Sequence, residues 1–191
     1  DSIAATHGGA YLVGGKLCGE VVGVDMDSVT INSRSLASVK LPMAAVRAVQ
    51  LSGDKGLTLP ETDPDGDILI LSNGDRVPGT INEINAETVS FNSALGDMQL
   101  ERSRVSGVVL MAPPGGRRQP TLPALRVGLT DGSSLTLQNA SCDGDSLRGM
   151  ISGNYQMELP VAKIAHIDIV GGRLVSLETL DVAEYQQQSI D

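Results

Sequence analysis

The sequence predicts an all-β protein made of three tandem copies of one small unit, each with five short strands and a short helical turn, packed as a compact array. Three observations predict this. Segments of the chain match one another at a regular spacing. Apolar and polar residues alternate over short runs, as in half-buried strands. Clusters of Gly, Asn, Asp and Ser separate these runs, as turns do.

The internal repeat spans most of the 191 residues. Equivalent leucines in the second half of each copy recur every 59 residues: Leu41, Leu100 and Leu159. The glycines of the first hairpin recur at spacings of 60 and 58 residues: Gly14, Gly74 and Gly132. We therefore assign the repeats to residues 8–51, 66–111 and 124–170, and residues 171–191 to a C-terminal tail or a linker to a following domain.

The second repeat shows the expected order of elements best. Residues 68–71 form a short apolar strand, and Asn73-Gly74 supplies the dipeptide that favours a tight hairpin. Alternating residues then predict two more strands at 77–81 and 88–91. A fourth strand covers 98–100, and a fifth covers 108–110 after a single helical turn. In the other two repeats a proline opens that turn, which suits its first position.

Gly- and Pro-rich segments connect the repeats, at residues 52–66 and 112–123. We interpret both as linkers or surface loops. A unit of about 45 residues is marginal by itself without a disulfide or metal framework. The three repeats are therefore expected to bury surface against one another.

The order of elements resembles small SH3-like barrels, and the second repeat resembles the first motif of the Sm-like family. The residues that carry this resemblance are 68–81, a strand, an Asn-Gly hairpin and then an apolar-x-Gly-x-apolar pattern. The resemblance implies a small five-stranded barrel for each repeat. It does not imply the uridine site of Sm-like proteins, because the corresponding loops, Asn85–Thr88 and Val105–Gly107, lack the cation.

The C-terminal segment 171–185 resembles the lead-in to an NPCBM-type carbohydrate-binding domain of large envelope-associated bacterial proteins. This resemblance implies that the chain is the repeat region of a longer, exported protein. The chain also opens without a basic and apolar leader, which fits a mature or trimmed chain. We therefore expect an extracytoplasmic location: periplasmic, secreted or associated with the cell envelope.

Composition argues against several kinds of partner. A net charge of −9 repels phosphate, and Arg117-Arg118 is the only adjacent basic pair, so nucleic acid is an unlikely partner. The chain has only four aromatic residues, which are too few for a ring-stacking platform, although Phe91 and Tyr155 are the candidates for a sugar site. No apolar run is long enough for a membrane span.

The residues able to hold metals or perform catalysis form no recognised motif. Cys18 and Cys142 could pair, be buried or be free, and with His7 and His166 they are a poor set for a metal site. The acidic segment 63–67 looks like a calcium loop, but its twelfth position is glycine, and we interpret it as a solvated linker.

Other polar groups have equally simple interpretations. Asp143-Gly144-Asp145 fits a hairpin turn, and His166 occupies a slot that Ala48 and Gly107 fill in the other repeats. A small anion patch could be formed by scattered cations, which otherwise serve solubility: Lys16, Arg76, Arg102 and Arg104.

These observations favour a non-catalytic interaction or scaffold module of an exported multidomain protein. The expected partner is another protein or a neighbouring domain of the same polypeptide. The alternative is a module that binds envelope polysaccharide, and a third is an Sm-like nucleic-acid binder. We predict no enzyme activity, no cofactor, and no catalytic, cofactor-binding or metal residues.

Overall fold

The computed structural model describes residues 8–52, 57–152 and 155–172. These ranges contain sixteen strands, all paired antiparallel, and three 3-10 turns, with no α-helix. The all-β prediction is confirmed. No helix in the described part of the chain is long and apolar enough to cross a membrane.

The strands follow the same order in each repeat, with five strands in the second and third, whereas the second strand is divided in two in the first repeat, which therefore has six. The first repeat holds β1 (Gly9–Leu12), β2 (Gly15–Cys18), β3 (Glu20–Val24), β4 (Ser28–Ser33), β5 (Ala37–Pro42), η1 (Met43–Ala45) and β6 (Val46–Gln50). The second holds β7 (Asp67–Leu71), β8 (Arg76–Ile84), β9 (Thr88–Ser93), β10 (Gly96–Glu101), η2 (Arg102–Arg104) and β11 (Val105–Val109). The third holds β12 (Ala124–Leu129), β13 (Ser134–Cys142), β14 (Ser146–Ile151), β15 (Tyr155–Pro160), η3 (Val161–Lys163) and β16 (Ile164–Val170).

Equivalent residues make equivalent backbone contacts in the three repeats. The hairpin glycines all have positive φ, as their turn requires: Gly14 (83°), Gly74 (91°) and Gly132 (87°). The first residue of each 3-10 turn donates its N–H to a carbonyl in the turn that precedes β4, β9 or β14: Met43 to Asp27, Arg102 to Glu87 and Val161 to Asp145. The repeat seen in the sequence is therefore a repeat of backbone geometry.

The repeats are not closed barrels, so the expectation of a small barrel for each repeat is wrong. In the described ranges no ladder joins β5 to β6, β10 to β11, or β15 to β16. In the first repeat β6 pairs with β1 on one edge and with β11 of the second repeat on the other. Strand β11 likewise pairs with β7 and β6. Because both edges of these strands are taken, neither can close a barrel, and the sheet continues from repeat to repeat.

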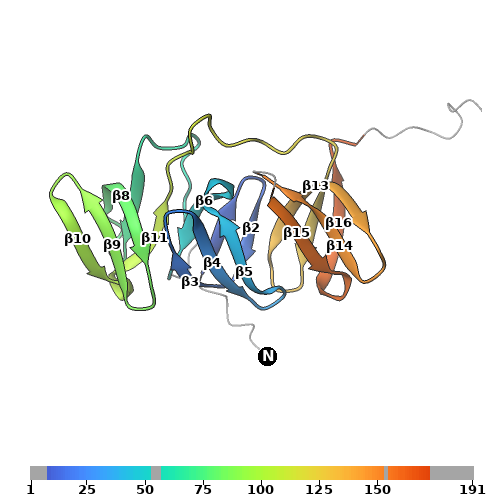
Figure 1. Cartoon of the computed structure of the whole chain (residues 1–191), viewed down its shortest axis with the longest axis horizontal. Coiled ribbons are helices and arrows are strands. Elements are labelled where there is room, and N and C mark those ends of the chain that lie inside the picture. The colour runs from blue at the N-terminus through green and yellow to red at the C-terminus, as the bar shows by residue number, and fades with distance from the viewer. Residues whose placement is uncertain (1–7, 53–56, 153–154, 173–191) are drawn as a thin grey trace, which may run out of the picture.

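The order of the repeats in space differs from their order in the chain. The first repeat lies in the middle, with the second on one side and the third on the other (Figure 1). It contacts the second through β6–β11 and through Val24 opposite Ile84. It contacts the third through Lys16 of β2 opposite Ser134 of β13. The expectation of packed repeats holds, but as one open sheet with a non-sequential order.

Both junctions pair equivalent residues with each other. In the first, Val49 pairs with Val108, and Leu51 N–H donates to Ser106 O (2.8 Å) while Leu110 N–H donates to Arg47 O (2.8 Å). With the offset of 59, these two bonds interchange under a two-fold rotation. In the second junction, Lys16 and Ser134 are also equivalent, two residues after their hairpin glycines. Adjacent repeats are therefore related by approximate two-fold axes.

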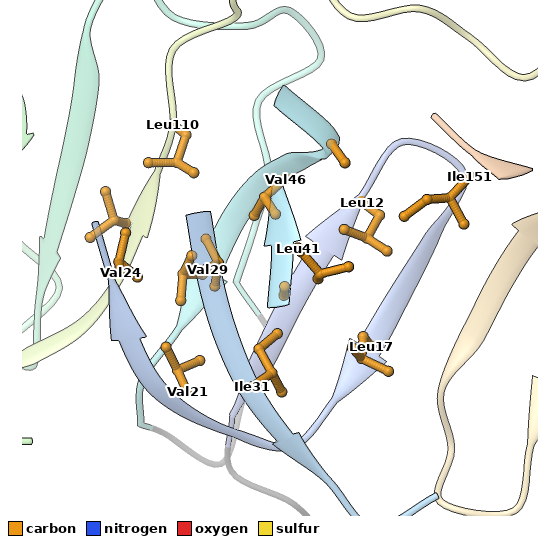
Figure 2. Close-up of a cluster of buried hydrophobic side chains, with 14 of the residues drawn as sticks. Leu12, Leu17, Val21, Val24, Val29, Ile31, Leu41, Val46, Leu110 and Ile151 are labelled. Atoms are coloured by element: carbon orange, nitrogen blue, oxygen red, sulfur yellow. The ribbon is translucent and has the colours of Figure 1, made fainter. Parts of the chain in front are cut away.

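One aliphatic core runs through the three repeats. Leu110 of the second repeat and Ile151 of the third belong to the same buried cluster as first-repeat residues such as Val24 and Val46 (Figure 2). Burial of apolar surface is the main favourable term in folding. The junctions therefore supply part of the core that each short repeat lacks by itself.

Candidate functional site

A cleft lies between the first and second repeats. Its volume is about 460 Å³, and three methionines contribute to its wall. The lining includes the apolar residues Met26, Met43, Leu110 and Met111 and the acidic residues Asp27 and Asp67. We call this the methionine cleft. Met26 is 79% exposed, so its side chain is available to a ligand.

Two carboxylates, those of Asp25 and Asp67, accept backbone hydrogen bonds that position the two sides of the cleft. On the first repeat, Asp25 Oδ1 accepts the N–H of Asp27 (2.9 Å) and of Ser28 (2.7 Å), which fixes the turn that carries Met26. The Ser28 hydroxyl and these N–H groups hold the pKa of Asp25 below its ordinary value. On the second repeat, Asp67 accepts the N–H of Ile81 and of Met111, both at 2.8 Å. The backbone of both walls is thus held by carboxylates, while the Met26 and Met111 side chains are 79% and 49% exposed.

The two-fold relation places a second cleft of about 450 Å³ on the other side of the junction. Ala86, Arg102 and Ser52 stand there at the positions of Met26, Met43 and Met111. The Arg102 guanidinium reaches into the first repeat and donates to Val21 O and, at 2.8 Å, to Asn85 O. Burial lowers the pKa of Arg102, an effect that Glu20 opposes. We call this second cleft the polar cleft, because the charged Arg102 side chain forms part of its wall.

Apolar side chains make up most of the lining of the methionine cleft, and its polar members are Thr80, Asp27 and Asp67. Methionine is flexible and polarisable, so a methionine wall adapts to apolar ligands of different shape. The carboxylate of Asp27 adds a negative charge at the cleft. The arrangement suits an apolar group with a neighbouring positive charge.

The acidic linker is partly built into the fold. Asp63 forms ion pairs with Arg117 (3.0 Å) and Arg47 (3.5 Å), and Asp67 holds the backbone of the methionine cleft. In the described ranges no group of three or more His, Cys, Asp and Glu side chains could hold a metal ion.

The adjacent basic pair does not form a surface patch. The Arg117 side chain is 3% exposed and donates to three carbonyl oxygens, those of Val46, Leu110 and Met111. Burial lowers the pKa of Arg117, and Asp63 opposes this effect. Arg117 therefore fastens the second linker across the junction between the first two repeats.

The other predicted cations also have contacts within the protein. Lys16 Nζ lies 4.7 Å from the centre of the Tyr11 ring, in a cation–π contact. Arg102 lines the polar cleft and donates to Val21 O, whereas Arg76 and Arg104 are exposed. The loops that correspond to an Sm-like uridine site are used as well, since Asn85 Oδ1 accepts two N–H groups of its own turn and Gly107 pairs with Gln50.

The aromatic, cysteine and histidine candidates lie apart. Phe91 is fully buried, whereas Tyr155 lines a small cleft of about 200 Å³ between β5 and β15. Both cysteines are free, Cys18 buried and Cys142 exposed. His166 is exposed on β16. His7 and most of the C-terminal tail lie outside the described residues.

Sequence reasoning missed the three methionines of the cleft. The repeat alignment contained a signal for them, because the residue at the equivalent position of the neighbouring repeat is small or polar in each case. Only the junction between two repeats brings them together. No family model, no curated protein and no solved structure matches this chain.

Proposed function

We propose that the chain is a non-catalytic interaction module that binds an apolar segment of a protein partner in the methionine cleft. The observation that carries the proposal is the contrast between the two related clefts. Both clefts are open, but hydrogen-bonded Arg102 gives one a charged wall, while three methionines give the other an apolar wall. Monomeric proteins leave such a surface open where it takes a ligand.

The charge of the chain narrows the expected partner. The net charge is −9, and the cleft includes Asp27 and Asp67, of which Asp67 already accepts two backbone N–H groups. Electrostatic complementarity increases association rates and selects partners by sign. We therefore expect the bound segment to combine a large aliphatic side chain with a nearby lysine or arginine.

Methionine methyl NMR tests this proposal directly. The six methionines provide separate reporters, of which Met98, Met150 and Met157 do not line the cleft. We would titrate methyl-labelled protein with synthetic peptides that carry Leu, Ile or Phe beside Lys, with matched peptides in which Ala replaces the apolar residue. Shifts confined to the cleft methyl groups of Met26, Met43 and Met111 are expected.

Variants give the corresponding control. Met26→Glu places a charge on the apolar wall and is expected to abolish peptide binding, whereas Leu95→Glu changes an exposed residue that does not line the cleft. If the complete peptide panel leaves the cleft methyl groups unmoved, or if both variants act alike, the proposal fails.

A polysaccharide-binding function is the second candidate, and one observation favours it. Tyr155, which is partly exposed, lines the small cleft between β5 and β15 together with Lys40 and Glu158. A sugar ring could stack on Tyr155, but not on buried Phe91. Binding to a glycan array that disappears in Tyr155→Ala would support it, and a blank array with the unaltered chain would exclude it.

We also infer that each repeat is an opened relative of an SH3-like unit, and that the module works outside the cytoplasm. The strand order and the 3-10 turn before the last strand support the first inference. Fractionation of the cells that make the protein would test the second.

A further inference from the structure

The last strand, β16, has a free edge that its counterparts in the other repeats use. Strands β6 and β11 pair with each other, whereas β16 pairs only with β12 in the described ranges. The exposures follow this difference. Val49 and Val108 are fully buried, but the equivalent Ile167 is 47% exposed. Leu110 is 3% exposed, but the equivalent Ile169 is 72% exposed.

The β6–β11 junction is self-complementary, so the same contact can form between two identical edges. Val49 pairs with its equivalent Val108, and the two flanking hydrogen bonds interchange under the approximate two-fold axis. Two-fold interfaces between identical chains are isologous in this way, with the same patch on both sides. Exposed edge strands are templates for such pairing.

We propose that two copies of this chain pair through their β16 edges, antiparallel and centred on Ile167, in the geometry of the β6–β11 junction. The register of that junction then places Ile167 opposite Ile167 of the second copy. Ile169 N–H donates to the Ala165 carbonyl of the second copy, and the reciprocal bond forms by symmetry. The interface is separate from the methionine cleft and does not depend on it.

The side chains of β16 are complementary to themselves in this register. Gly107 pairs with Gln50 in the β6–β11 junction, and their equivalents in β16 are His166 and Asp168. In the proposed dimer His166 therefore lies opposite Asp168 of the second copy. The two-fold axis creates this pair twice. With the His166 imidazole protonated, this places opposite charges directly across the two strands, which stabilises a sheet. A strand that carries both a basic and an acidic residue at these positions selects a second copy of itself.

Cys142 provides an independent marker of the same geometry. Val24 and Ile84, which pair across the first junction, are equivalent to Cys142, because all three pair with the equivalent residue of the next strand: Val29, Val89 and Leu147. The proposed dimer therefore places Cys142 opposite Cys142 of the second copy. Residues directly opposed in antiparallel strands have Cα atoms about 4.5–5.5 Å apart, within the range of about 4.4–6.8 Å that a disulfide spans.

The experiment combines the mass of the full chain in solution with crosslinking through this cysteine. Sedimentation or light scattering with the reduced protein should show a concentration-dependent dimer. Diamide should then join the two Cys142 thiols: each thiol loses one electron and one proton, an S–S bond forms, and diamide is reduced to its hydrazine. Cys142→Ser should remove the crosslink and keep the dimer, while Cys18→Ser, at a buried thiol, should keep both.

Surface variants test the edge itself. Ile169→Lys is expected to abolish the dimer, and Leu95→Lys, which changes a side chain that is 92% exposed elsewhere, should leave it intact. Asp168→Lys should weaken the dimer, and the added change His166→Glu should restore it by reversing both charges. Because His166 Nε2 also lies 3.9 Å from Asp168 Oδ2 of the same chain, the rescue is measured as the dissociation constant of the dimer and not as the stability of the monomer.

Three outcomes would overturn the proposal. One is a chain that stays monomeric up to its solubility limit. Another is a dimer that is insensitive to Ile169→Lys and forms no Cys142 crosslink. The third is a monomer whose β16 amides are protected from hydrogen exchange along the free edge, which would assign that edge to a segment of the same chain.

Discussion

Leu110→Ala tests whether the first and second repeats share one core. Leu110 follows the last strand of the second repeat, is 3% exposed, and belongs to the buried cluster that includes Val24 and Val46 of the first repeat (Figure 2). Truncation removes three buried carbon groups. At about 0.8 kcal/mol for each, the loss of transfer free energy is about 2.4 kcal/mol.

The cavity left by the substitution adds to this loss. Leu→Ala changes in cores cost about 2–5 kcal/mol, and the value depends on how far the site collapses. Leu110 also lines the methionine cleft, where flexible Met26 and Met43 can fill part of the space. We therefore expect the free energy of unfolding to fall by about 3 kcal/mol, in the lower half of that range.

Urea denaturation followed by far-ultraviolet circular dichroism measures this change. Because the repeats share ladders and a core, we expect one unfolding transition for the unaltered chain and one for Leu110→Ala. Leu95→Ala is the matched control, since the Leu95 side chain is 92% exposed and its loss should change stability by less than about 0.5 kcal/mol. A loss below about 1 kcal/mol in Leu110→Ala, or separate transitions in the unaltered chain, would refute a shared core.

Three further changes probe the junctions. Arg117→Met leaves Asp63 without its 3.0 Å partner and should lower the free energy of unfolding by about 3 kcal/mol in urea denaturation, with little effect from Arg118→Met at an exposed side chain. Gly15→Ala would place a Cβ 2.2 Å from Ser134 O, so it should destabilise the chain by about 1–3 kcal/mol, and a neutral effect in thermal denaturation would contradict this close approach. Asp131→Asn should destabilise the chain at neutral pH, and the difference should disappear in acid.

The sign of the Asp131 effect follows from its contacts. Burial acts to raise the pKa of Asp131, but hydrogen bonds from Ser133, Ser33 and Ser35 outweigh it, so the pKa lies below its ordinary value. The Ser33 hydroxyl donates to Asp131 Oδ2 at 2.8 Å across the junction between the first and third repeats. A lowered pKa contributes stability above the unfolded pKa of about 3.9, and this contribution is lost as pH falls through the folded pKa. Urea denaturation of the unaltered chain and of Asp131→Asn from neutral to acid pH measures this contribution. A difference in the free energy of unfolding that stays constant with pH would contradict this explanation.

The repeat alignment predicted much of the local structure. The glycines at positions 14, 74 and 132 mark hairpins that require positive φ, and the alternation of apolar residues marks strands with one buried face. These features depend on neighbouring residues in the chain, so a sequence contains them directly. Barrel closure, an expectation that proved wrong, concerns pairing between distant strands.

The open sheet could not be predicted from any one repeat. Val49 and Val108 look like ordinary core residues in the sequence, and nothing local shows that their strands pair with each other. Hydrogen bonds between edges are made by the backbone, which is the same for every residue except proline. The choice between closing a barrel and joining a neighbour is therefore left to the packing of the whole chain.

The features of the fold and of the candidate sites can be separated into those that the sequence determined and those that only tertiary structure decided. The sequence by itself determined the three repeats, their strands, their acidic charge and their aliphatic cores. Tertiary structure alone decided that the first repeat lies between the other two, that Met26, Met43 and Met111 meet in one cleft, and that β16 keeps a free edge. The physical reason is that each of these features arises at a contact between repeats, where residues far apart in the chain bury surface together.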